Sequence, residues 1–121
     1  MANILLIEDD PIFRDMLGEM LSRGGHQVRT ACDGEQGLDM AKSQEPELII
    51  TDVLMPKMDG IETVIALEKA GIRAPIIAIS GGRRSISPAF NLESATLMGV
   101  KATLTKPFTW ADLRQAIDKV L

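Results

Sequence analysis

The sequence predicts an α/β protein built on one parallel β-sheet with helices on both faces. Short apolar runs of four or five residues alternate along the chain with longer segments whose apolar residues have helical spacing. Several runs, such as NILLI and PIIAI, are apolar at nearly every position, which is typical of strands buried on both faces. The regular alternation of strand and helix favours parallel strands joined by helical crossovers.

The expected strands lie at residues 3–7, 27–31, 48–51, 75–79 and 101–105. The expected helices lie at about residues 11–23, 34–43, 61–70, 88–98 and 110–121. For the first helix, Asp10 is the expected N-cap and Pro11 suits the first turn, while Gly24 and Gly25 end it.

The later helices carry their own boundary residues. Asp33 with Gln36 resembles a capping box, in which two side chains bond each other's backbone amides, and so does Thr109 with Asp112. The third helix has apolar residues at helical spacing and is expected to end near Gly71. The fourth is expected to begin at Ser87–Pro88 and to stop at Gly99.

Length and composition indicate one globular domain. The chain has 121 residues, of which 45% are hydrophobic and 25% charged. No apolar run approaches the roughly 18 residues of a membrane span, and the N-terminus lacks the basic region of a secretory signal. We therefore expect a single domain over residues 1–121, located in the cytoplasm, with no contact to a membrane.

Charge and cysteine content exclude further classes of function and of structure. Thirteen basic against seventeen acidic residues give a net charge of −4, which disfavours nucleic-acid binding because phosphate contacts need clustered Lys and Arg. The single cysteine, Cys32, excludes an internal disulfide and is expected to be a small buried filler in a reducing compartment.

Polar residues gather where the predicted strands end, at the edge where such sheets bind ligands. They are Glu8, Asp9 and Asp10 after the first strand, Asp52 after the third, Ser80 after the fourth, and Lys106–Pro107 after the fifth. Carboxylates this close together cannot all stay ionised without a cation, and Mg²⁺ prefers such ligands together with water and phosphate oxygens. An aspartate in this setting can attack phosphorus and form an acyl phosphate.

These motifs, with MPKMDG after Asp52 and Phe108 after Lys106–Pro107, resemble the receiver domain of response regulators, and single-domain chemotaxis regulators are similar. The resemblance covers the whole chain. It implies a flavodoxin-like, doubly wound five-stranded sheet of order 2-1-3-4-5 with five flanking helices, and one receiver domain without an output domain. It also implies a place in two-component signalling, with a sensor histidine kinase or histidine phosphotransfer protein as donor and an unidentified protein as target.

The resemblance assigns a role to each site residue. Asp52 is implied to be the phospho-acceptor, Ser80 the switch hydroxyl, and Lys106 the partner of the phosphoryl group, with a cis peptide before Pro107. Mg²⁺ is implied to be held by Glu8, Asp9, Asp52 and the backbone carbonyl of Leu54. Asp10 is expected to cap a helix rather than to bind metal. The chain is therefore expected to be a phosphorylation switch with self-catalysed transfer and slow loss of phosphate, not an enzyme.

Two features depart from the family's pattern, one at Thr103 and one in the loop after Ser80. Thr103 stands where the family usually has an aromatic residue that reports the switch. The loop after Ser80 is longer than usual and carries Arg83 and Arg84. Leu54 and Gly82 offer no polar side chain to a hydrolytic water, which predicts a long-lived phosphorylated state.

Two other functions fit the same fold. A flavin binder would need a phosphate-cradling loop after the first strand, and the acidic Glu8–Asp10 would repel phosphate there. A scaffold that is never phosphorylated would not need the complete set of site residues.

Overall fold

The computed structural model describes residues 2–52, 60–80 and 100–121. In these residues five parallel strands form one sheet in the order β2-β1-β3-β4-β5, and the order and the parallel pairing are as expected. The elements are β1 (Asn3–Ile7), α1 (Pro11–Arg23), β2 (Gln27–Ala31), α2 (Gly34–Ser43), β3 (Leu48–Asp52), α3 (Gly60–Lys69), β4 (Ile76–Ser80), β5 (Val100–Thr105) and α5 (Trp110–Val120). The expected fourth helix, residues 88–98, lies outside the described residues.

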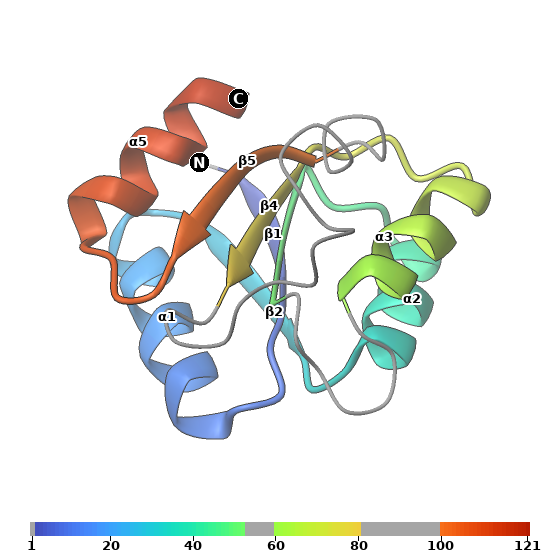
Figure 1. Cartoon of the computed structure of the whole chain (residues 1–121), viewed down its shortest axis with the longest axis horizontal. Helices are drawn as coiled ribbons and strands as arrows, with labels where there is room; N and C mark the ends of the chain where they lie inside the picture. Colours follow the sequence, from blue (N-terminus) through green and yellow to red (C-terminus); the bar gives the residue numbers. More distant parts are fainter. Residues whose placement is uncertain (1, 53–59, 81–99) are drawn as a thin grey trace.

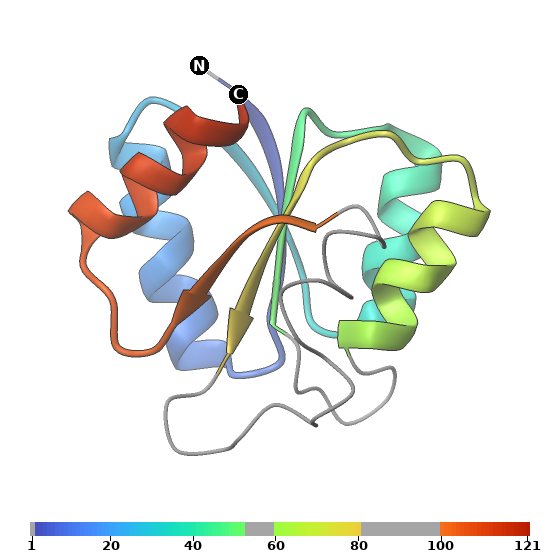
Figure 2. The ribbon, with the colours of Figure 1, turned by 45° about the horizontal axis from the view of Figure 1, so that its top comes forward.

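The sheet lies between two helical layers. Figure 1 shows α1 and α5 on one face and α2 and α3 on the other, and Figure 2 shows the same layers from a second direction. Side chains of a strand alternate between the faces, so Ile4 and Leu6 of β1 join the core under α1 and α5. Leu5 and Ile7 join the core under α2 and α3. The central strands are therefore buried on both faces, which explains their continuous apolar sequence.

The residues predicted to begin α1 and α5 cap these helices as expected. Asp10 caps α1 by accepting a hydrogen bond from the amide of Ile12 at 3.0 Å, and Pro11 occupies its first turn. Thr109 and Asp112 form the complete predicted capping box of α5.

The capping box predicted for α2 is half formed. The amide of Gln36 donates to Asp33 at 2.8 Å, but the carboxamide of Gln36 accepts from the amide of Cys32 at 2.7 Å instead of that of Asp33. The expectation that Cys32 is buried is wrong, because the residue is exposed at the turn that leads into α2.

Glycines set two features of the helices. Gly71 adopts φ +80°, the left-handed conformation that glycine tolerates best, just beyond the end of α3. Gly37 lies where α2 packs on β1, and a Cβ there would come within 2.7 Å of Ile7 Cγ1.

Within the described residues, no helix combines the length and apolar character that crossing a bilayer requires.

Candidate functional site

Strand register brings the predicted site residues to one edge of the sheet. Ile7 at the end of β1 pairs with Thr51 of β3, so the next residues, Glu8 and Asp52, lie side by side. Asp52 in turn pairs with Ile79 of β4. The carboxyl ends of the parallel strands therefore meet, as the strand-end pattern predicted.

Three carboxylates cluster at this edge. One oxygen atom from each of Glu8, Asp9 and Asp52 lies within 4.8 Å of the others. Glu8 is 1% exposed and Asp52 is 6% exposed, while Asp9 is half-buried. The backbone amide of Asp9 donates to Glu8 Oε2 at 3.0 Å, which ties the two neighbours together.

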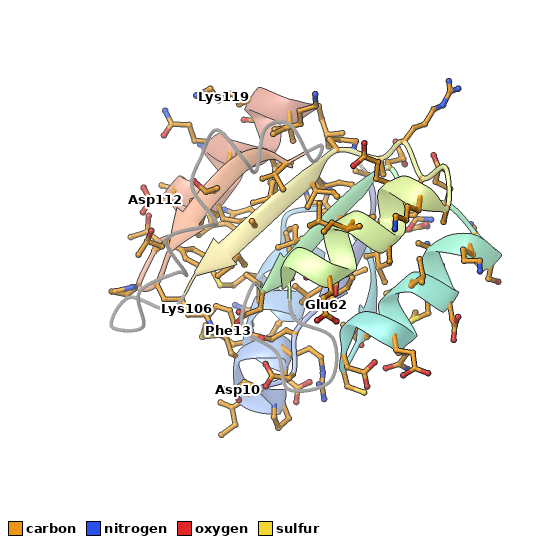
Figure 3. The ribbon with its side chains drawn as sticks, turned by 45° about the vertical axis from the view of Figure 1, so that its right-hand side comes forward. Asp10, Phe13, Glu62, Lys106, Asp112 and Lys119 are labelled. Atoms are coloured by element: carbon orange, nitrogen blue, oxygen red, sulfur yellow. The ribbon has the colours of Figure 1, made fainter. Side chains whose placement is uncertain are left out.

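Lys106 joins the cluster from the end of β5. Its Nζ lies 3.0 Å from Glu8 Oε1 and 3.1 Å from Asp52 Oδ2, so one ammonium pairs with two buried carboxylates. The peptide bond between Lys106 and Pro107 is cis, as expected. Figure 3 shows the Lys106 side chain at the carboxyl end of the strands, beside α1.

Burial shapes the ionisation of the site. The pKa of Glu8 is raised to about 8, mainly by burial. A hydrogen bond with Asp52 and the charge of Asp52 also raise this pKa, while Lys106 lowers it. Burial also lowers the pKa of Lys106, but its bonds to Glu8 and Asp52 outweigh that effect and leave the pKa raised. A single ammonium therefore does not offset all the negative charge that these carboxylates can carry.

The donor set suits a hard divalent cation. Carboxylate oxygens are the preferred ligands of Mg²⁺, and a bound cation would stabilise the ionised form of Glu8 that burial disfavours. The cluster of Glu8, Asp9 and Asp52 can thus bind a metal ion.

The other residues singled out in the sequence have three different outcomes. Asp10 does not join the metal cluster but caps α1, as expected. Ser80 is the last residue of β4 and pairs with Thr105 of β5, while its side chain is outside the described part of the structure. Leu54, Gly82, Arg83 and Arg84 lie outside the described residues.

Two residues of α1 contact the site without having been predicted there. The guanidinium of Arg14 donates to the backbone carbonyl of Glu8 at 3.0 Å. The ring of Phe13 lies beneath the Lys106 ammonium, with 3.9 Å from Nζ to the ring centroid. The helical spacing of Phe13 indicated a position in the core. Its place in the helical turn directly after the acidic residues was the sequence feature that could have indicated contact with the site.

Comparison with known proteins agrees with this geometry. The family model for the response regulator receiver domain matches residues 4–118. The probable C4-dicarboxylate response regulator DctR of Bacillus subtilis is 32% identical over 96% of this chain and 50% of its own length. The alkaline phosphatase synthesis transcriptional regulatory protein PhoP of Bacillus subtilis is 31% identical over 98% of this chain and 48% of its own length.

A solved structure of a relative has a similar fold. The chemotaxis protein CheY4 of Vibrio cholerae superposes with a TM-score of 0.86 at 31% identity, covering 100% of this chain and 99% of that one. By contrast, the chain spans about half the length of the first two curated relatives.

Proposed function

Because this chain belongs to the response regulator receiver domain family, we propose that it accepts a phosphoryl group on Asp52 in a two-component phosphorelay. The donor is a phosphohistidine of a sensor histidine kinase or histidine phosphotransfer protein, and the transfer depends on Mg²⁺. The observation that carries this proposal is the Lys106 ammonium, 3.1 Å from Asp52 within an acidic cluster able to hold a metal ion. A buried carboxylate flanked by a cation and metal ligands is suited to attack on phosphorus.

The proposed step begins with a carboxylate oxygen of Asp52 attacking the phosphorus of the donor. An O–P bond forms and the N–P bond breaks. The leaving imidazole keeps the electron pair of that bond and takes up a proton from solvent. Lys106 then donates from Nζ to a phosphoryl oxygen, which offsets the charge that develops during transfer.

Glu8, Asp9 and Asp52 would hold the Mg²⁺ ion, with the backbone carbonyl of Leu54 as a further ligand. Bound there, the ion would offset negative charge on the carboxylates and the phosphoryl oxygens. Direct contact is assigned to Asp9, which is half-buried, and water-mediated contact to Glu8, whose Oε1 is already bonded to Lys106.

Phosphorylation is proposed to switch protein–protein contacts through Ser80 and Lys106. In the phosphorylated state the Ser80 hydroxyl would donate to a phosphoryl oxygen, and the position of Ser80 at the end of β4 supports this role. Thr103, exposed on β5, lacks the ring that commonly couples to the switch in this family. We therefore assign the output to the segment that follows Ser80, and the target is a further protein.

The protein is proposed to be a signalling switch that catalyses its own phosphorylation and loses the phosphate slowly, rather than an enzyme acting on a separate substrate. The proposed location is the cytoplasm, which supplies Mg²⁺ and phosphoryl groups derived from ATP. The net charge of −4 supports the absence of direct nucleic-acid contact by this domain. No membrane contact is proposed.

The test is incubation with a small phosphodonor and Mg²⁺ followed by intact-mass measurement. The parent chain is expected to gain one phosphoryl group, and Asp52→Asn is expected to gain none. Asp39→Asn is the matched control, because it makes the same chemical change at an exposed position of α2. Equal labelling of Asp52→Asn and the parent would disprove the assignment.

A further inference from the structure

We propose that Phe13 is a positioning residue that holds the Lys106 ammonium in place for phosphoryl transfer. The inference rests on the proposed function, in which Lys106 pairs with the phosphoryl group. The Lys106 Nζ lies 3.9 Å from the centroid of the Phe13 ring, well inside the roughly 6 Å at which a ring face attracts a cation. Figure 3 labels both residues, which lie together at the carboxyl end of the sheet.

The ring adds a third contact to the ammonium. An ammonium has three N–H donors, and Lys106 directs hydrogen bonds to Glu8 Oε1 and Asp52 Oδ2. The Lys106 side chain is 26% exposed and a lysine stem is flexible, so the head group can still shift toward solvent when only two hydrogen bonds hold it. The face of Phe13 restricts that movement.

Phe13 is itself fixed from two directions. Its backbone amide lies 3.4 Å from Asp10 Oδ1, within the cap that begins α1. Its ring is perpendicular to that of Phe108, with 6.0 Å between centroids and an interplanar angle of 89°. Because Phe108 follows Lys106 by two residues, the segment that presents the ammonium also holds the ring beneath it.

A ring suits this position better than a third carboxylate or an aliphatic side chain. An additional carboxylate would neutralise the ammonium and compete with the phosphoryl oxygen for its protons. Leucine would fill space near the ammonium but would not attract it. The ring attracts the cation through its quadrupole and carries no net charge, so Lys106 keeps its full charge for the phosphoryl group.

The first test is the rate of phosphorylation by a small phosphodonor with Mg²⁺. Phe13→Leu is expected to lower the rate constant about three- to tenfold, while Phe13→Tyr, which keeps a ring, retains the parent rate. Ile12→Leu is the matched control, because Ile12 is the exposed neighbour of Phe13 in the first turn of α1, and this variant is expected to retain the parent rate. An unchanged rate in Phe13→Leu, or an equal loss in Phe13→Tyr or in Ile12→Leu, would overturn the proposal.

The second test does not depend on phosphorylation. Cε of Lys106 is bonded to Nζ, which lies 3.9 Å from the ring centroid. The NMR signals of the Cε protons are therefore expected upfield of those of other lysines in the parent and in Phe13→Tyr. The shift is expected to disappear in Phe13→Leu, and Phe13→Met replaces that variant if it does not fold. Ordinary lysine shifts in the parent would disprove the contact. A parent that shows the upfield shift but takes up no phosphoryl group would disprove the proposed function and leave the contact established.

Discussion

At the scale of single residues, the site combines buried carboxylates with one shared ammonium. Glu8 and Asp52 are both almost fully buried, and Lys106 bridges them. Because burial and the neighbouring Asp52 disfavour the ionised form of Glu8, keeping this carboxylate charged carries an electrostatic strain. That strain has a measurable effect on stability.

We expect the metal-free protein to lose stability as the pH rises from about 4.5 to about 8. The pKa of Glu8 is raised from 4.5 to about 8 on folding, so the folded state holds a proton there that the unfolded state releases over this interval. The contribution is fully present below pH 4.5 and is lost as the pH rises through 8. Urea unfolding in the presence of a chelator measures it.

The Glu8→Gln variant removes this titration and should flatten the pH dependence over the same interval. Glu45→Gln is the control, because Glu45 is exposed between α2 and β3. A pH dependence that persists in Glu8→Gln would show that another group is responsible.

Asp9 and Asp10 are adjacent in sequence, but their substitution should have different effects. Asp9→Ala is expected to abolish Mg²⁺ binding, because Asp9 contributes to the carboxylate cluster. Asp10→Ala is expected to keep binding and to lower the free energy of unfolding by about 1 kcal/mol, because Asp10 caps α1. Metal titration and urea unfolding of both variants measure the two effects. Equal losses of metal binding would mean that the cap and the ligand had been assigned to the wrong residues.

The convergence of Glu8, Asp9, Asp52 and Lys106 was predictable because parallel strands bring their carboxyl ends to one edge, whatever the details of packing. The contact between Phe13 and Lys106 was not predictable in this way. It depends on how α1 is oriented against β5, and the two residues are 93 positions apart (106 − 13). Sequence periodicity could place Phe13 on the buried side of its helix but not beneath a particular ammonium.

At the scale of elements, the sequence predicted where helices and strands begin and end better than it predicted how they pack. The predicted strands and the four described helices appear within one or two residues of their expected ends, because apolar runs and caps are local features. The half-formed capping box of α2 was not foreseen, since either neighbouring amide lies within reach of the Gln36 side chain. The sequence also carried no indication that Gly37 is a contact point.

Gly37→Ala and Gly18→Ala should have opposite effects, although both raise helix propensity. Gly18 in α1 has Thr30 Cγ2 3.9 Å from an added Cβ, an ordinary contact, so Gly18→Ala is expected to raise the free energy of unfolding by up to about 1 kcal/mol. At Gly37 the added Cβ would overlap Ile7, and overpacking is expected to lower that free energy by about 1–3 kcal/mol. Urea unfolding of both variants measures the difference, and stabilisation by both would contradict the close packing of α2 on β1.

At the scale of the whole molecule, the site draws residues from the segment after β1, from β3 and from the segment after β5. A ligand there therefore links distant parts of the chain. A Mg²⁺ concentration 100 times its Kd is expected to raise the free energy of unfolding by about 2.7 kcal/mol, because the unfolded chain lacks the assembled ligands. Thermal unfolding with and without Mg²⁺ measures this effect. Asp39→Asn should retain it, and a full effect in Asp9→Ala would contradict the location of the site.

The parallel sheet has a practical consequence for measuring partner binding. Each helix returns the chain to the amino ends of the strands, and Figures 1 and 2 show both termini near that end, away from the tips of β4 and β5. A biotin tag or fluorophore at either terminus would therefore sit away from the carboxylate cluster. Molecules immobilised on a sensor chip through such a tag would turn the carboxyl end of the sheet, rather than its amino end, toward the flowing solution.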